Sequence, residues 1–517
     1  MKKSIFYVFC FAVVNLISCT ATRKSSVTGK NDGKIEVTFV QVNDVYEIAP
    51  LEGGKIGGMA RVATLKKEFL KKNPNTFLIM AGDFVSPSVY NSLKYEGRRI
   101  RGKQMIEAMN VAGTDLAVFG NHEFDINEDE LQDRINESNF KWISSNTFHK
   151  TKEGISPFVK VTSSGSEPIP ETYIISVKDA DGTTAKIGFI GLTIPFNKAD
   201  YVSYTDPLTA AETMYNRIKD SCDAVVAITH QLVQDDSLLA VKIPGLAMIL
   251  GGHEHDMRFK KVGNVFITKA HSNARSAYIV DLDINKKDHS IKVFPELKMI
   301  DTTVAIDSAT NVVVKKWMNI AEENYASIGF DAKKVVMQSG DPLDGREVEI
   351  RKGPTNLTKM IVAAMQEAAP DADMVIFNSG SIRVDDIIQA PVLQYDIIRS
   401  LPYGGPIVEV DMKGSLLMQT LEAGRNNVGL GGFLQYSPYV LYSSKTSNWT
   451  LKNQTIDSAK IYKVALLDFL MTGGEANMGF LTKDNPGVIK VYPMSADTSD
   501  PRYDIRLAIV NYLEKKK

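Results

Sequence analysis

Side chains that can bind metal stand at the ends of several short apolar segments. Four of the seven histidines in the chain are among them, together with two aspartates and one asparagine. They are Asp44, Asp83, Asn121, His122, His230, His253 and His255. A single histidine at such a place is usually structural. A set of ligand-type side chains at equivalent buried ends needs shared partners, and a metal supplies them.

The types of these side chains select a class of metal site. Carboxylate, imidazole and amide groups are present without a thiolate, which excludes a structural cysteine–zinc site. The set is typical of a catalytic centre holding Mn, Zn, Mg, Co or Fe, and it suffices for two divalent ions. Two ions about 3.5–4 Å apart can clamp both oxygens of a phosphoryl transfer and generate a hydroxide at neutral pH.

The apolar segments have the length and composition of buried strands. With their polar ends they cover 37–44, 76–83, 115–122, 224–230 and 246–253. Segments with helix-like sequence lie between them, at 61–72, 104–111 and 209–220. This alternation predicts an α/β layered domain, in which ligands collect at the carboxyl ends of the strands.

The rest of the chain predicts a second domain. A polar stretch with helical spacing covers 307–330 and suggests an interdomain helix. Beyond about residue 335 new signals begin, with helices expected at 355–369 and 414–423 and strands at 374–378, 407–411 and 461–466. A chain of 517 residues is too long for one core, so at least two domains are expected.

Composition narrows the class of protein. The chain is 44% hydrophobic and 23% charged with a net charge of −1, which are the proportions of a globular protein. They exclude a disordered chain and a polytopic membrane protein. Without a general positive field, a nucleic acid polymer is not an expected partner. The sequence carries no signal for an oligomeric state.

The N-terminus predicts export. A basic start is followed by a mostly apolar stretch over 5–17, which is too short for a comfortable membrane span and is typical of a signal peptide. Leu16-Ile17-Ser18-Cys19 resembles the lipobox of bacterial lipoproteins, in which the chain is cut before the cysteine and the thiol is lipidated. The alternative is a plain secretory signal with a chance cysteine. We expect a membrane-anchored lipoprotein of the cell envelope, facing the periplasm or the cell surface.

The motifs around the candidate ligands carry a family resemblance. They are Asn43-Asp44, Gly82-Asp83, Gly120-Asn121-His122-Glu123-Phe124-Asp125, Thr229-His230 and Gly251-Gly252-His253-Glu254-His255. Their order resembles that of the calcineurin-like metallophosphatases and, more closely, that of the bacterial 5′-nucleotidase / UDP-sugar hydrolase family. The resemblance covers nearly the whole mature chain. It implies a four-layered metallophosphatase β-sandwich flanked by helices, plus a second α/β substrate-binding domain.

Composition and resemblance together predict the boundaries. Residues 1–18 form the signal peptide, 19–34 a tether, 35–305 the metallophosphatase domain, 306–334 the interdomain helix or linker, and 335–517 the 5′-nucleotidase C-terminal domain.

The resemblance also implies roles. Asp83 would bridge two metal ions, with Asp44 and His255 completing one site. The other site would be completed by Asn121, His230 and His253. His122 would stabilise the transition state while Asp125 orients its imidazole, and a metal-bound hydroxide would be the nucleophile.

One residue departs from the family pattern. The family usually has Asp-x-His at the first strand end, where this chain has Asp44-Val45-Tyr46. A neutral tyrosine is a poor metal ligand. Members of the family often have Asn or Gln where His255 stands, so one hypothesis is that His255 compensates for Tyr46 and a dinuclear centre survives. The rival interpretation is a weakened first site with reduced or altered activity.

The C-terminal half resembles the substrate-binding domain of the same nucleotidases. The motifs are Phe377–Arg383, Leu401–Gly405, Gly432–Gln435 and Asp468–Phe480. By position, the substrate contacts would be Asn378, Arg383, Phe433, Phe480 and Asp484. The two phenylalanines would sandwich a base, since stacking on aromatic rings tolerates different bases. The alternative for both rings is a place in the core. A further arginine is expected upstream, and Arg346 and Arg351 are equal candidates.

The leading hypothesis is a metal-dependent phosphohydrolase that removes phosphate from nucleotides. The alternatives are a related hydrolase of UDP-sugars, cyclic nucleotides or other phosphoesters, and a nucleotide-binding lipoprotein with a weakened metal site.

Overall fold

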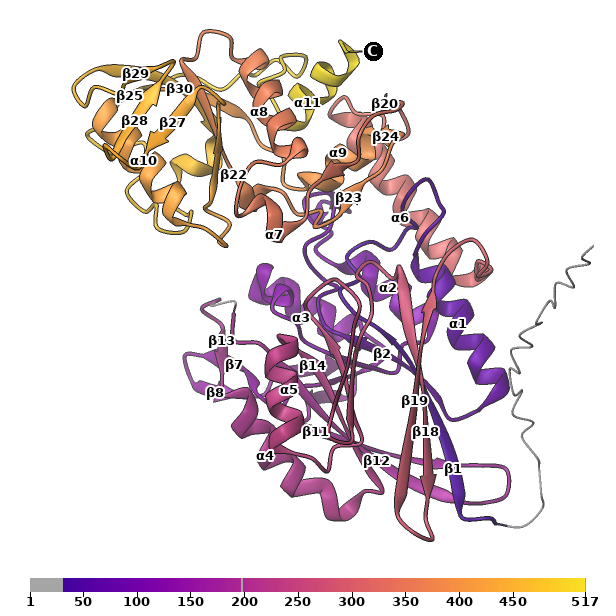
Figure 1. Ribbon diagram of the computed structural model, residues 1–517. Helices are drawn as coiled ribbons and strands as arrows, with labels where there is room; N and C mark the ends of the chain where they lie inside the picture. The colour runs from indigo at the N-terminus through magenta and orange to yellow at the C-terminus, as the bar shows by residue number, and fades with distance from the viewer. Residues whose placement is uncertain (1–30, 197–198, 517) are drawn as a thin grey trace, which may run out of the picture.

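The computed structural model describes residues 31–196 and 199–516. The predicted signal peptide, Cys19 and most of the predicted tether lie outside these residues. Two lobes are joined along one side by helix α6 (Ser308–Ser327), as Figure 1 shows. No helix of the described chain has the length and apolar composition needed to cross a membrane.

Two six-stranded sheets of the described residues form the N-terminal lobe. The first has the order β19 (Ser290–Met299), β18 (Ser276–Asn285), β1 (Lys34–Val42), β2 (Thr76–Ala81), β5 (Leu116–Val118) and β6 (Lys141–Ile143). The second has the order β11 (Thr172–Lys178), β12 (Thr184–Thr193), β14 (Ala224–His230), β15 (Met248–Gly252), β17 (Val265–Lys269) and β16 (Arg258–Val262). The central four strands are parallel in the second sheet, as are β1, β2, β5 and β6 in the first.

The two sheets pack face to face around a buried core. Phe39 of β1 meets Phe189 of β12 edge to face, with ring centroids 5.9 Å apart. Aliphatic residues of both sheets fill the space around them, including Val37, Ile228 and Leu250. A strand that is buried on both faces has a continuous run of apolar residues, and such runs predict strands from the sequence.

Helices cover the two outer faces. On the first sheet lie α1 (Met59–Lys72), α2 (Lys103–Ala112), α3 (Glu128–Glu137) and α6. On the second lie α4 (Pro207–Ile218) and α5 (Val233–Lys242). The predicted four-layered sandwich is therefore confirmed.

The C-terminal lobe is the predicted second α/β domain. Its main sheet has the order β26 (Leu434–Tyr436), β22 (Met374–Asn378), β30 (Ile461–Leu467), β25 (Ile407–Lys413) and β31 (Val488–Val491). Helix α10 (Gly414–Asn426) packs on one face. The other face is covered by α8 (Asn356–Ala368), α9 (Gln394–Ser400) and α11 (Ile505–Glu514). Short strand pairs and the one-turn helix α7 (Glu347–Ile350) complete the lobe.

Helix α6 connects the two cores. It occupies the segment predicted to be an interdomain helix and packs against α1 and α2. Its buried Trp317 and Tyr325 belong to one apolar cluster that extends from the first sheet into the C-terminal lobe. The domain boundaries at 305 and 335 stay predictions.

Candidate metal centre and substrate face

The carboxyl ends of strands from both sheets meet at one edge of the sandwich. Asp44 follows β1, Asp83 follows β2, and His230 is the last residue of β14. Their ligand atoms all lie within 4.8 Å of one another, and the three side chains are buried. The predicted bridging aspartate and its neighbours are thus brought together by the sheets, as expected for strand ends in such folds.

Four of the predicted ligands have a left-handed backbone. The φ angles are 52° at Asp44, 55° at Asp83, 97° at His253 and 58° at His255. Such conformations are uncommon for residues other than glycine, cost about 1–3 kcal/mol each and cluster at functional sites. The chain turns sharply as it leaves each strand, and this turn directs the side chains into the centre.

Two buried polar atoms of the centre have no hydrogen-bond partner among the described residues. His230 Nδ1 donates to the carbonyl of Ala81 at 2.8 Å, which leaves Nε2 facing Asp83 Oδ2 at 3.0 Å. His230 Nε2 and Asn121 Oδ1 are the unpartnered atoms. Buried atoms with lone pairs need partners. The side chains around these two atoms therefore fit a bound cation, which would accept those lone pairs.

The electrostatics of the centre also favour a positive charge. Burial disfavours the charged imidazole, but the carboxylates of Asp83 and Asp44 outweigh it and raise the pKa of His230 to about 9. At His253, burial and the neighbouring His230 lower the pKa to about 3. His253 is therefore neutral and has a lone pair available to a metal.

Glu123 holds two loops of the centre in place. Its carboxylate accepts the backbone N–H groups of Asp83, Phe84, Val85 and Gly120 at 2.9, 2.7, 3.0 and 2.5 Å. Glu123 stands inside the Gly-Asn-His-Glu motif but is not among the site residues predicted from the sequence. A buried carboxylate that accepts several backbone donors fixes the geometry of the residues around it.

His122 and Asp125 form a pair beside the ligands. His122 Nδ1 lies 2.7 Å from Asp125 Oδ2, and the backbone N–H of His122 donates to Asp83 Oδ1 at 2.8 Å. Both side chains are partly exposed, at 21% and 20%. Because Asp125 holds Nδ1, the other ring nitrogen of His122 is the one that could contact a substrate.

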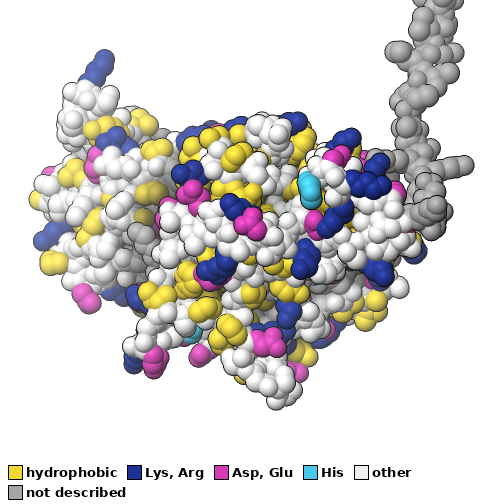
Figure 2. Space-filling view, turned by 90° about the horizontal axis from the view of Figure 1, so that it is seen from below, with side chains coloured by type: hydrophobic (Ala, Val, Ile, Leu, Met, Phe, Trp, Pro, Cys, Tyr) yellow, Lys and Arg dark blue, Asp and Glu magenta, His cyan; other side chains and the backbone are white. Residues whose placement is uncertain are grey.

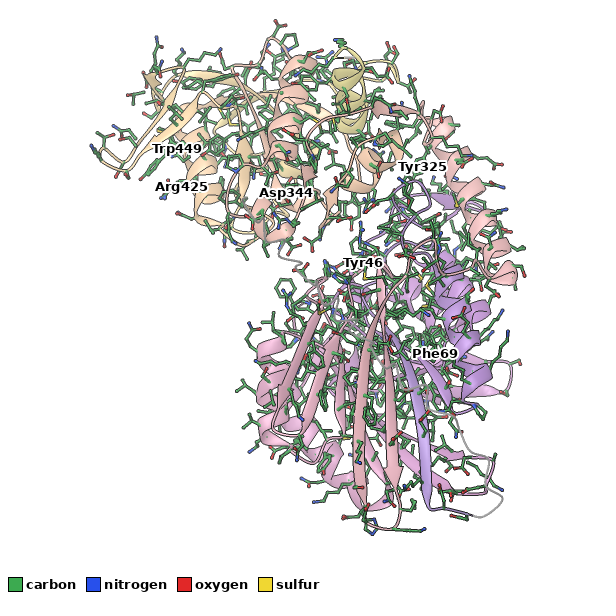
Figure 3. The ribbon with its side chains drawn as sticks, turned by 45° about the vertical axis from the view of Figure 1, so that its right-hand side comes forward. Tyr46, Phe69, Tyr325, Asp344, Arg425 and Trp449 are labelled. Atoms are coloured by element: carbon green, nitrogen blue, oxygen red, sulfur yellow. The ribbon has the colours of Figure 1, made fainter. Side chains whose placement is uncertain are left out.

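Tyr46 occupies the place of the usual histidine. Its hydroxyl lies 2.8 Å from His255 Nε2, 3.2 Å from Asp83 Oδ2 and 3.4 Å from Asp44 Oδ1. Burial and the two carboxylates raise its pKa well above the usual value of 10, so the phenol is neutral. Figure 3 shows Tyr46 at the junction of the two lobes.

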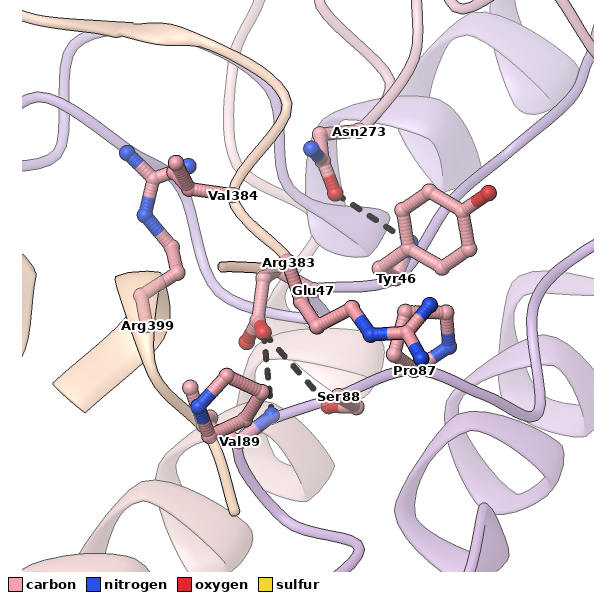
Figure 4. Close-up of a pocket in the computed structure, with 10 residues that line it drawn as sticks. Tyr46, Glu47, Pro87, Ser88, Val89, Asn273, Arg383, Val384 and Arg399 are labelled. Carbon is pink, nitrogen blue, oxygen red and sulfur yellow. Dashed lines mark hydrogen bonds between the residues drawn. The ribbon is translucent and has the colours of Figure 1, made fainter. Parts of the chain in front are cut away.

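The C-terminal lobe contributes Arg383 and Asn378. Arg383 lines a small cleft between the lobes together with Tyr46 and Pro87, and its guanidinium lies beside both in Figure 4. That guanidinium is 5.8 Å from the ring centroid of Tyr403. Asn378 Nδ2 donates to Glu475 Oε2 at 2.6 Å. Tyr403 and Glu475 stand in motifs that resemble the family, although neither is a contact predicted from the sequence.

The remaining predicted contacts differ in setting. The segment before Phe433 passes close to Glu475, because a Cβ atom added to Gly432 would lie 3.1 Å from Glu475 Oε1. Phe480 is half-buried against the apolar core of the lobe, and Asp484 is exposed. Their roles stay predictions.

The structure separates the two candidate upstream arginines. Arg346 is paired with Asp344 and its side chain is 44% exposed. Arg351 is mostly buried, at 13%, and close enough to Arg383 and Glu475 for their charges to act on its pKa, which burial lowers. We therefore favour Arg351.

Comparison with known proteins agrees with this fold. A model of the calcineurin-like phosphoesterases matches residues 37–257, and a model of the 5′-nucleotidase C-terminal domain matches residues 335–482. The 5′-nucleotidase of Rattus norvegicus is 23% identical across 85% of this chain and 83% of its own. Protein UshA of Yersinia enterocolitica is 23% identical across 93% of this chain and 96% of its own.

A solved structure shares the fold. The 5′-nucleotidase precursor from Thermus thermophilus superposes with a TM-score of 0.69 over 93% of this chain and 97% of its own, at 20% identity. Fold and site therefore define a two-domain metallophosphatase. The chain belongs to the metal-dependent phosphoesterases that join a calcineurin-like domain to a 5′-nucleotidase C-terminal domain.

Proposed function

We propose that this phosphoesterase removes phosphate from nucleotides. The observation that carries the proposal is the position of the centre. Asp44, Asp83 and His230 converge at one edge of the sandwich, and Arg383 of the C-terminal lobe lines a cleft with Tyr46, whose hydroxyl contacts Asp83. A nucleotide whose base lies on the second lobe would therefore place its phosphate at the metal centre.

Two divalent ions, when bound, polarise the phosphoryl group and activate water. Asp83 would be shared by the two ions, Asp44 and His255 would hold one, and Asn121, His230 and His253 would hold the other. His122 would hold a proton at Nε2 and donate a hydrogen bond to a phosphoryl oxygen. Because Nδ1 would donate to Asp125 at the same time, the imidazole would be doubly protonated, and the Asp125 carboxylate would stabilise that charged form.

The second lobe would select the substrate. Arg383 and Arg351 are cations suited to anionic oxygens, which guanidinium groups bind in a fork geometry. Asn378 and Glu475, already bonded to each other, offer a donor and an acceptor to a sugar or base. Phe433, whose backbone carbonyl accepts the N–H of Ser379 next to Asn378, would stack a base. On the face seen in Figure 2, charges of both signs are interspersed, so no continuous basic surface is available there for a polymer.

Hydrolysis assays test the proposal, with free phosphate measured for the monoesters and the product nucleotide measured for the UDP-sugar and the cyclic nucleotide, whose cleavage frees no phosphate. The purified chain would receive AMP, a UDP-sugar, a cyclic nucleotide and a generic phosphomonoester, with Mn or Zn and an EDTA control. We expect release from AMP that depends on metal. Release from the generic ester alone would retain the metal centre and reject the nucleotide assignment. Preference for the UDP-sugar or the cyclic nucleotide would select a related hydrolase.

A second candidate is a nucleotide-binding protein with a weakened first site. The position of Tyr46 favours it, because its hydroxyl lies 2.8 Å from the His255 nitrogen that would bind the ion. Nucleotide binding without hydrolysis of any substrate would support this candidate.

We further propose that the chain is a lipoprotein of the cell envelope, anchored through Cys19. The lipobox-like sequence before that residue supports the proposal. Replacement Cys19→Ser should move the protein from the membrane fraction to the soluble fraction. Equal membrane association of both forms would reject the anchor.

A further inference from the structure

The C-terminal lobe reaches the metal loop through two adjacent aspartates. Asp385 Oδ2 bonds to Nδ1 of His255, and Asp385 Oδ1 accepts the backbone N–H of Glu347 at 2.5 Å. Asp386 forms an ion pair with Arg275 of the N-terminal lobe. The two neighbours thus contact the same lobe in different ways, since only Asp385 touches a candidate ligand.

The backbone at Asp385 is held in an uncommon conformation. Its φ angle is 37°, in the left-handed region that non-glycine residues rarely adopt. Such conformations persist where the surroundings fix them, and they concentrate at functional positions. At Asp385, the bond to Glu347 fixes one carboxylate oxygen and leaves the other directed at His255.

The contact determines which nitrogen of His255 faces the centre. With Nδ1 donating to Asp385, the lone pair is on Nε2. That nitrogen lies 3.5 Å from Asp44 Oδ1 and 2.8 Å from the Tyr46 hydroxyl. A carboxylate on the far nitrogen of a ligating histidine fixes its tautomer, orients its ring and increases its basicity. The side chains of His255 and Asp385 are only 17% and 22% exposed, so water screens the pair weakly.

We propose that Asp385 is a positioning residue for the metal site of Asp44 and His255, supplied by one lobe to the other. The inference rests on the proposed function, because it assumes that His255 binds an ion. Asp385 acts through His255 and touches neither ion nor substrate. Metal occupancy of this site and contact between the lobes are then coupled, and each strengthens the other by the same factor.

Two matched substitutions in the full chain test the inference. Asp385→Asn keeps the size of the side chain, and asparagine tolerates a left-handed backbone. Asp386→Asn is the control, because it disturbs the same interface without contacting His255. Metal content after dialysis would be measured by mass spectrometry, and Mn and Zn affinities by calorimetric titration. Both readouts are independent of turnover.

We expect wild type to bind two ions. Asp385→Asn should bind one of them about 10–100-fold more weakly, the usual effect of losing the outer partner of a ligating histidine. Asp386→Asn should keep both affinities within about twofold. Unchanged affinities in Asp385→Asn would overturn the inference and leave the metal centre intact. An equal loss in both variants would overturn it too, since the effect would then come from the interface in general. A wild-type chain without bound ions would instead overturn the proposed function on which it rests.

Discussion

At the scale of residues, the candidate metal centre has an unusual combination around Asp44. Tyr46 is neutral and buried, and it lies in hydrogen-bond contact with His255. Tyr46 stands where the family pattern has a histidine, and His255 stands where the family often has Asn or Gln. The chemistry of the site depends on whether these two changes compensate.

A rescue experiment decides between compensation and a weakened site. We expect His255→Ala to lose one of two ions and about 100-fold in phosphate release, because the first site then retains only carboxylates. Adding Tyr46→His to that variant should restore most of the binding, since it returns an imidazole to the same site from the other side. Metal analysis and phosphate release measure both steps. Wild-type metal content in His255→Ala would contradict compensation.

At the scale of elements, the turns after the strands create the centre. Gly82 lies between β2 and Asp83 with φ 81°, and its carbonyl accepts the N–H of Asp44 at 3.0 Å. An added Cβ would lie 2.5 Å from His230 Nδ1, closer than real contacts allow. The position therefore requires glycine for two reasons, backbone conformation and close approach.

A pair of glycine substitutions separates those reasons. Gly113, after α2, has a similar φ of 77°, and an added Cβ there would meet nothing within 4 Å. Each alanine substitution should cost about 1–2 kcal/mol for the left-handed backbone. We expect Gly82→Ala to cost more than Gly113→Ala and, unlike it, to reduce metal content, because His230 must move. Urea unfolding and metal analysis provide the measurements. Equal effects of the two substitutions would show that the cost comes from the left-handed backbone alone and not from the close approach to His230.

At the scale of the whole molecule, the two lobes also meet at a buried carboxyl group. The hydroxyl of Tyr395 in the C-terminal lobe donates to Glu47 Oε2 at 2.9 Å. Burial raises the pKa of Glu47 from 4.5 to about 7, although Tyr395, Val89 and Arg399 oppose the shift. The folded molecule therefore holds this proton more tightly than the unfolded chain does.

The sign of the shift predicts how stability depends on pH. A raised carboxyl pKa contributes stability that is complete below about pH 4.5 and is lost as the pH rises through 7. Between pH 5 and pH 8, wild type should lose about 2–3 kcal/mol relative to Glu47→Gln, whose side chain does not titrate. Thermal unfolding of both proteins at the two pH values measures the difference. Parallel pH profiles would show that Glu47 keeps its ordinary pKa.

The sequence by itself determined the candidate ligands and the strands that carry them. Runs buried on both faces are continuously apolar, so 374–378 is a strand in the prediction and in the structure alike. The candidate ligands could be recognised in the sequence because Asp44, Asp83 and His230 stand where such apolar runs end. The long β18–β19 pair was missed, because the outer strand alternates between half-buried and exposed residues and lacks a continuous apolar run.

Only the tertiary structure decided which groups meet across the lobes. Asp385 and His255 are 130 residues apart, and no local pattern links them. The same holds for Glu47 with Tyr395. Local sequence specifies the period and burial of an element, whereas contacts between lobes depend on how complete elements pack. Chemistry inside one lobe could therefore be predicted, while the residues that couple the lobes could be found only in the folded molecule.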